Sequence, residues 1–134
     1  MAYAQRMLEA HPWPGHVDRS VLAECIEACV ECAQACQSCA DACLSEESVA
    51  DLRKCIRLNL DCDDVCSATA RVLTRQTEYD APLSRALVEV CRQACATCGE
   101  ECESHASHHE HCRICAEACR RCEQACAAFL DAMK

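Results

Sequence analysis

Residues 25–43 read CIEACVECAQACQSCADAC, and this segment decides the fold. Its six cysteines are spaced 4, 3, 4, 3 and 4 residues apart. This alternation is the a/d repeat that places one side chain per turn on the seam of a helical bundle. The segment therefore predicts a long helix with a stripe of thiols on one face, about 27 Å long at 1.5 Å rise per residue.

Three later segments repeat the spacing, so all eighteen cysteines belong to one of four stripes. Asn59 occupies the one position that the second stripe skips. A bundle normally places Leu or Ile at such positions, so the stripes should face one another around the axis as a tube of thiols. The stripes are Cys25, Cys29, Cys32, Cys36, Cys39 and Cys43; Cys55, Cys62 and Cys66; Cys91, Cys95, Cys98 and Cys102; and Cys112, Cys115, Cys119, Cys122 and Cys126.

Helix caps and breakers mark the joints between the helices. A Pro-rich segment at residues 11–15 separates a short N-terminal helix, and Asp18 is placed to cap the first long helix. Ser48, together with Asp51, is the expected start of the second, and Asp80 that of the third. Ser107, with Glu110 three residues later, forms a capping box for the fourth. The predicted helices span roughly residues 3–10, 18–44, 48–76, 80–105 and 107–133.

These elements predict an all-α protein, an antiparallel up-down-up-down four-helix bundle with a short extra N-terminal helix. Only two glycines and three prolines interrupt the helical pattern, and no segment shows the alternation typical of a strand. With 134 residues, the chain is long enough for one domain and too short for two ordinary ones. Residues 1–134 are therefore predicted to form a single domain.

Charge and hydropathy narrow the range of partners. The formal net charge of −9 argues against nucleic acid and anionic membrane surfaces. No apolar stretch reaches the roughly 18 residues needed to span a bilayer. Residues 1–10 lack the apolar core of a signal peptide, so we expect a cytoplasmic protein whose thiols stay reduced.

The stripes favour soft-metal binding over the other uses of cysteine. A core of cysteine alone would be under-packed, and i, i+4 pairs on a helix are too far apart for disulfides. The spacing also lacks the pattern of iron–sulfur ligands. Two thiolates at i and i+4 can hold a two-coordinate ion, and thiolate-rich sites select Cu(I). We therefore expect many Cu(I) ions, roughly one per cysteine.

Two functions other than copper storage could also use many cysteines. A general thiol buffer for Zn(II) or Cd(II) is the alternative, although zinc usually takes four ligands in discrete C-x2-C knuckles. A redox enzyme or sensor would need one or two exposed, activated cysteines rather than eighteen on a seam. No catalytic constellation is recognisable, so the chain is not expected to be an enzyme.

The two ends of the predicted bundle differ in chemistry. At one end the stripes run out into His105 and His108, which are predicted metal ligands because imidazole binds copper. For His109 and His111, a ligand role and a solvated role both remain open. Asn59 is either a buried register-setting group or an oxygen donor. The opposite end is expected to be plugged by Leu22, Leu73, Leu87, Val88, Phe129 and Met133.

With its C-x3-C pairs on four helices and its histidine cluster at residues 105–111, the chain resembles the cytosolic branch of the bacterial copper storage proteins. The resemblance covers essentially the whole chain. It implies a homotetramer of bundles filled with Cu(I), which would store or detoxify copper and exchange it with copper chaperones or small thiols. Exported members carry a twin-arginine signal and methionines at the mouth, and this chain has neither. Outward apolar residues, such as Ile26, Val30, Ile56 and Ile114, would permit association.

Overall fold

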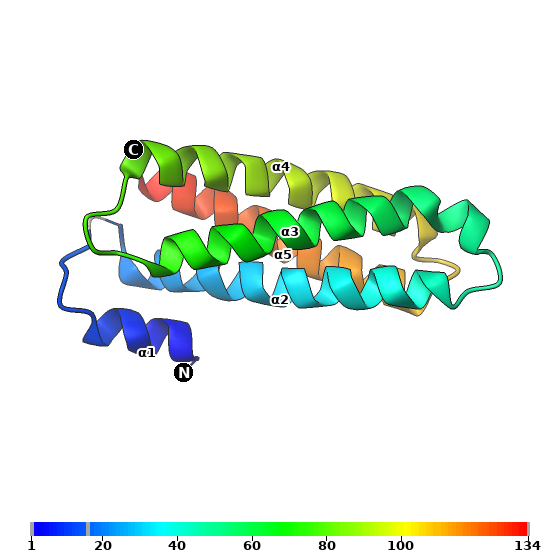
Figure 1. The fold of residues 1–134 in the computed structure, drawn as a ribbon, viewed down its shortest axis with the longest axis horizontal. Helices are drawn as coiled ribbons and strands as arrows, with labels where there is room; N and C mark the ends of the chain where they lie inside the picture. Colours follow the sequence, from blue (N-terminus) through cyan, green and yellow to red (C-terminus); the bar gives the residue numbers. More distant parts are fainter. Residues whose placement is uncertain (1, 16, 134) are drawn as a thin grey trace.

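The four predicted stripes lie on four long helices of a computed structural model, which describes residues 2–15 and 17–133 (Figure 1). A short helix precedes them, and a single 3-10 turn lies between the first two. Within the described residues all regular structure is helical, which confirms the all-α prediction. The elements are α1 (Tyr3–Ala10), α2 (Arg19–Leu44), η1 (Val49–Leu52), α3 (Arg53–Thr74), α4 (Ala81–His105) and α5 (Glu110–Ala132).

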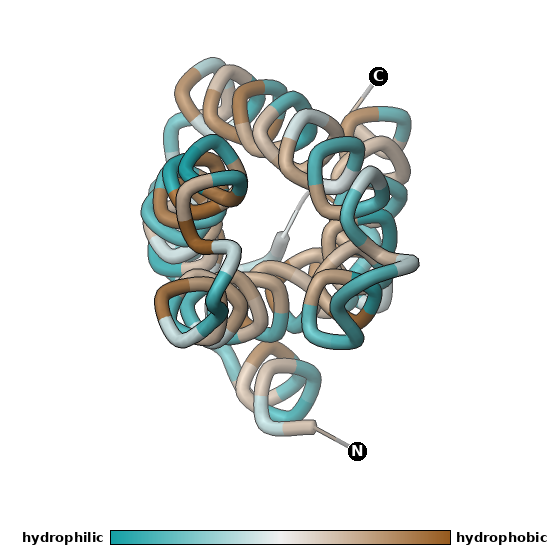
Figure 2. Tube along the Cα trace, turned by 90° about the vertical axis from the view of Figure 1, so that its right-hand side faces the viewer, coloured by the Kyte–Doolittle hydropathy of each residue, from teal (hydrophilic) through white to brown (hydrophobic). Residues whose placement is uncertain are grey.

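The long helices form the antiparallel up-down-up-down bundle expected from the short joints. Helix α2 packs between α3 and α5, and α4 packs between the same two helices on the opposite side. The α2–α3 and α4–α5 joints share one end of the bundle, at the right of Figure 1, and the α3–α4 joint lies at the other. Seen along the axis, the helices turn apolar faces inward and polar faces outward (Figure 2).

Side-chain caps explain two of the four helix starts. The carboxylate of Asp18 accepts hydrogen bonds from the backbone N–H groups of Ser20 and Val21, and that of Asp80 accepts one from Leu83. Each cap satisfies donors that the first helical turn leaves without a partner. Pro82 lies in the first turn of α4, where its missing N–H costs little.

The other two predicted starts are wrong. Ser48 forms no side-chain cap, and the chain passes through η1 before α3 begins at Arg53. The capping box at Ser107 does not form either, because α5 begins at Glu110 with His109 at the N-cap position and no side-chain cap bond. The carboxylate of Glu110 instead pairs with Arg113 one turn further along the same helix.

Helix α1 lies outside the bundle, beside α2 (Figures 1 and 2). The prediction that Ile26 faces outward is wrong. This side chain is only 5% exposed, because it lies near Tyr3 and Ala4 of α1. Val30 and Ile114 do face outward, and Ile56 is partly buried against the core. None of the helices described is long and apolar enough to cross a membrane.

The end of the bundle that holds the α3–α4 joint is closed by apolar side chains, as predicted. Leu22, Leu73, Val88 and Phe129 are buried, one from each long helix. Leu87 and Met133 are half-buried at the same end. This apolar layer packs four large side chains together and seals the thiol-lined segment from that side, while buried Leu52 lies at the other end of the bundle.

Gly99 allows α4 and α5 to approach closely beside the thiols. A Cβ atom at this position would lie 3.3 Å from the Cβ of Cys119 and 3.3 Å from side-chain atoms of Arg120. A glycine inside a helix costs roughly 0.5–1 kcal/mol relative to alanine. The close approach of α5 offsets that cost.

Replacing Phe129 by alanine tests the role of the apolar layer. Because this ring is 2% exposed, Phe129→Ala is expected to lower the free energy of unfolding by about 3–5 kcal/mol. Urea unfolding of the reduced, metal-free protein measures the loss. Val90→Ala, at a half-exposed position, is the control and should change stability by less than about 0.5 kcal/mol. A loss below 1 kcal/mol for Phe129→Ala would show that the layer does not hold the bundle together.

Candidate metal centre

The eighteen cysteines form one continuous column along the bundle axis. Every one is a free thiol with at most 1% of its surface exposed. Neighbouring Sγ atoms lie between 3.6 Å, for Cys66 and Cys95, and 4.0 Å, for Cys36 and Cys98. A disulfide would bring two sulfur atoms to about 2.05 Å, so the column consists of reduced thiols in van der Waals contact.

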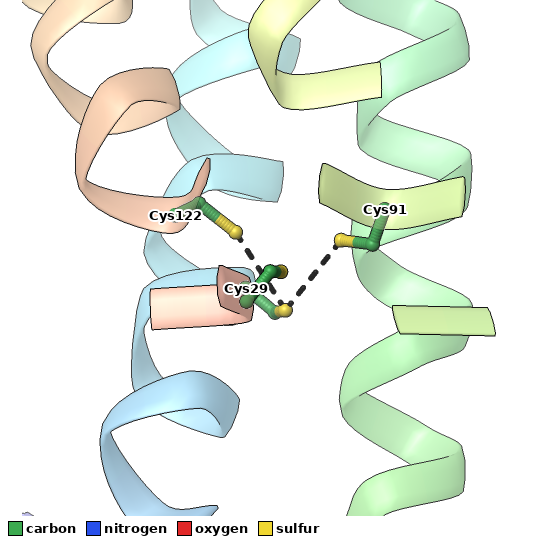
Figure 3. A group of neighbouring side chains, drawn as sticks. Cys29, Cys91 and Cys122 are labelled. Carbon is green, nitrogen blue, oxygen red and sulfur yellow. Dashed lines mark hydrogen bonds between the residues drawn. The ribbon is translucent and has the colours of Figure 1, made fainter. Parts of the chain in front are cut away.

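The thiols meet across the axis as well as along each helix. Cys29 on α2 lies 3.8 Å from Cys91 on α4, the helix diagonally opposite, and 3.7 Å from Cys122 on α5. Figure 3 shows these three sulfur atoms pointing toward one another. The a/d register produces this convergence, because every turn of each helix adds one thiol at nearly the same height.

Several groups of four ligands are already gathered closely enough to share a metal ion. In each group, the sulfur or nitrogen atoms all lie within 4.8 Å of one another. Cys32, Cys36, Cys119 and Cys122 each belong to at least two of these groups, so an ion in one group competes with an ion in the next. Five of the groups are Cys29, Cys91, Cys122 and Cys126; Cys32, Cys66, Cys95 and Cys122; Cys32, Cys36, Cys62 and Cys119; Cys36, Cys98, Cys115 and Cys119; and Cys39, Cys43, His111 and Cys112.

The column contains no built-in positive charge to balance thiolates. The buried polar side chains among the described residues are Asn59, Thr69, Gln76 and Ser84, all of them neutral. Burial, followed by the charge of the neighbouring Cys39, raises the pKa of Cys43 to about 11. The pKa of Cys112 is raised for the same reasons. These thiols therefore hold their protons at neutral pH until a cation replaces them.

Asn59 lies inside the column and is fully bonded to thiols. Its Oδ1 accepts from Cys98 Sγ at 3.0 Å and from Cys102 and Cys115 Sγ at 3.4 Å. Its Nδ2 donates to Cys55 Sγ at 3.7 Å. The amide ties together thiols on α3, α4 and α5, which fits the register-setting role and also places an oxygen atom next to three sulfur atoms.

The end of the column opposite the apolar layer, which we call the mouth, carries the histidine cluster. His111 directs Nδ1 toward Cys39 Sγ at 3.4 Å and Cys112 Sγ at 3.6 Å, so its ring stands at the end of the thiols. On its other side, Nε2 lies 2.8 Å from Oε2 of Glu46. His111 therefore completes a group of potential ligands with Cys39, Cys43 and Cys112.

The two histidines predicted as ligands are placed differently. His105 is half-buried, and its Nε2 lies 2.9 Å from Oε2 of Glu101. His108 is exposed on the turn before α5. Because α5 begins only at Glu110, His108 does not lie on the helix that carries Cys112.

The capping box that does not form explains why the sequence alone does not single out His111. A helix starting at Ser107 would have put His108 on the cysteine stripe and His111 beside it. Glu46 was missed altogether, because nothing in the sequence links a carboxylate in the α2–α3 joint to a ring 65 residues later. Only the shared end of two antiparallel hairpins hints that these joints meet.

Comparison with known proteins gives a consistent result. A solved structure of the copper storage protein Ccsp from Streptomyces lividans, loaded with 10 copper equivalents, is 58% identical, with a TM-score of 0.94 over 96% of this chain and 98% of that one. Apo-Csp3, copper storage protein 3 from Bacillus subtilis, is 35% identical, with a TM-score of 0.67 over 79% of this chain and 95% of that one. The cysteine-rich protein YhjQ of Bacillus subtilis (strain 168) is 37% identical over 92 residues, which are 69% of this chain and 80% of the relative.

The family model described as copper storage protein matches residues 18–131, which include all four long helices and every cysteine. The match leaves out α1 and the segment that joins it to α2. The thiol column and its histidine-bearing end thus lie inside the matched region, and the chain belongs to the copper storage protein family.

Proposed function

We propose that this protein stores Cu(I) inside its four-helix bundle, on the thiolates of the eighteen-cysteine column. The observation that carries the proposal is the continuity of the column, in which every sulfur atom is buried and all but those of Cys25, Cys43 and Cys126 lie within 4.0 Å of another sulfur atom. Thiolate sulfur is a soft ligand that selects Cu(I). Shared thiolates can bridge neighbouring ions, so capacity reaches about one ion per cysteine, on the order of 18 per chain.

Charge balance favours a monovalent cargo. Each Cu(I) that replaces one thiol proton leaves the dry interior neutral. A Zn(II) or Cd(II) ion held by four thiolates carries a net charge of −2, and burying such a charge without a partner is costly. The neutral set of buried polar side chains offers no compensation. A general thiol buffer for Zn(II) or Cd(II) is therefore the less favoured hypothesis.

All eighteen cysteines and His111 are the proposed ligands, with His105 and His108 as residues that pass ions at the mouth. His105 follows Cys102 by three residues at the end of α4, and exposed His108 is accessible to a copper donor. Imidazole binds copper and exchanges it readily enough for this transit role. The donors and acceptors would be copper chaperones or small thiols.

The role is proposed to be storage or detoxification rather than catalysis, because burial leaves no thiol free to attack an external substrate. A cytoplasmic location is supported by the Streptomyces lividans relative, which is described as a cytosolic copper storage protein. A homotetramer is supported by outward apolar side chains, with Val30 54% and Ile114 50% exposed. Nucleic acid and membranes are not proposed as partners, since the net charge is −9.

An anaerobic titration of the reduced protein with Cu(I) tests the proposal. A competing Cu(I) chelator reports the free metal, and the end point gives ions bound per chain. We expect uptake close to one ion per cysteine, with the chelator outcompeted until the column fills. Saturation at one or two ions per chain would exclude a store.

A further inference from the structure

One carboxylate at the mouth contacts two imidazole rings. Glu46 lies in the joint between α2 and η1, and its Oε2 is 2.8 Å from Nε2 of His111 and 2.8 Å from Nδ1 of His109. The two rings are stacked, with centroids 5.4 Å apart and planes inclined by 23°. Glu46 thus connects the joint after α2 to the start of α5. It contacts Nδ1 of one ring and Nε2 of the other.

A carboxylate can only accept hydrogen bonds, so His111 must present the N–H of Nε2 to Glu46. Glutamate is ordinarily ionised at neutral pH, so Glu46 acts as the acceptor for His111. His111 must then carry its proton on Nε2. In the neutral ring, the lone pair is left on Nδ1, the atom that faces Cys39 and Cys112.

A metal-binding imidazole needs this arrangement. The nitrogen that binds the metal has to be unprotonated, and a carboxylate on the other nitrogen fixes both the tautomer and the orientation of the ring. The ring of His111 has 26% of its side-chain surface exposed, so packing alone does not hold it in place. Glu46 supplies the missing constraint.

We propose that Glu46 is a positioning residue that fixes His111 as the Nε2–H tautomer, so that Nδ1 completes a Cu(I) site with Cys39, Cys43 and Cys112. The inference rests on the proposed copper-storing function. The same Oε2 of Glu46 also lies 2.8 Å from Nδ1 of His109, whose ring stacks on that of His111.

The tautomer of His111 is measured directly by long-range 1H–15N correlation spectra of reduced, metal-free protein labelled with 15N-histidine, at a pH where the ring is neutral. Comparison with His111→Ala assigns its signals. We expect wild type to show the Nε2–H form of His111, and Glu46→Ala to show a mixture of tautomers. Glu46→Gln keeps an acceptor oxygen of similar shape and should restore most of the Nε2–H form.

Copper transfer from a Cu(I)–chelator complex gives the functional readout. Removing the hydrogen-bond partner of a metal-binding histidine typically lowers metal affinity or activity 10- to 100-fold. Glu46→Ala should therefore slow the first transfer step by about tenfold or more. Final capacity should stay the same, since the eighteen thiols remain. Glu47→Ala is the matched control, because it removes an exposed carboxylate from the same joint. His111→Ala should add little to Glu46→Ala, since both changes remove the same ligand.

Two results would overturn the proposal: an Nδ1–H form of His111 in wild type, or a Glu46→Ala variant that loads no more slowly than Glu47→Ala. The first is read from the wild-type protein, and His111→Ala serves only to assign the signal. If the protein does not store copper at all, the result is distinguishable, since wild type would then saturate far below one ion per cysteine. A filled wild-type column with unaltered loading in Glu46→Ala would reject only the role of Glu46.

Discussion

Filling the column with Cu(I) is expected to raise the midpoint of thermal unfolding by about 20 °C or more. The metal-free interior is lined by small cysteine side chains and lacks large apolar groups between the mouth and the layer around Phe129. Bound ions fill that space and link four helices. A ligand present at a thousandfold above its Kd stabilises the folded state by about 4 kcal/mol per site. The unfolded chain keeps its thiols and also binds Cu(I), so only part of this gain survives. A net gain of about 5 kcal/mol suffices for the expected shift.

Circular dichroism at rising temperature, under anaerobic conditions, measures the midpoint for the metal-free and the loaded protein. The shift should grow steadily with the number of ions added, because each ion joins thiols from more than one helix. An unchanged or lowered midpoint at full loading would mean that copper binds to an unfolded or rearranged chain rather than inside this bundle.

The second large effect is a difference in capacity between monovalent and divalent soft ions. Cu(I) is expected to reach about 18 ions per chain, whereas Zn(II) should saturate at about four or fewer, because each Zn(II) takes four thiolates. The shared membership of Cys32 and Cys36 in two four-ligand groups lowers the divalent number further. The uncompensated charge of each buried tetrathiolate should also make Zn(II) easy to displace with Cu(I).

Ag(I) separates charge from coordination preference in this comparison. It is a soft monovalent ion, so a neutral interior should accept it in numbers close to those of Cu(I). Metal analysis after anaerobic gel filtration gives the number of each ion per chain. Retention of Zn(II) well above four ions per chain, or Zn(II) that resists Cu(I), would favour the general thiol buffer.

The sequence predicts the bundle well because one repeat carries most of the information. The 4-3 spacing of the cysteines sets helix, inward face and register together, and all eighteen cysteines lie where that spacing puts them. Asp18 and Asp80 mark helix starts reliably, because the backbone donors they satisfy are local. Local signals fail at the mouth, where Glu110 pairs with Arg113 instead of capping its own helix.

A helix start at Ser107 places His108 on the cysteine stripe, whereas in the structure the ring of His111 lies against Cys39 and Cys112. The start of α5 depends on how the joint packs against the rest of the mouth, where Glu46 bonds to His109 and His111. Contacts between two joints so far apart in the chain produce no periodic pattern in the amino-acid sequence. Ile26 shows the same limit, because only the placement of α1 beside α2 reveals that this outward position is covered.

Native mass spectrometry of the anaerobically loaded protein tests the central claim most directly, because the mass reports both the copper atoms bound and the protons lost. The buried polar side chains described are all neutral, so each Cu(I) that enters must displace a thiol proton to keep the interior uncharged. The account predicts a folded chain with about 18 copper atoms and one proton lost for each, which leaves the column neutral. A folded chain that stops at a few copper atoms, or that loses two or more protons per ion, would contradict it.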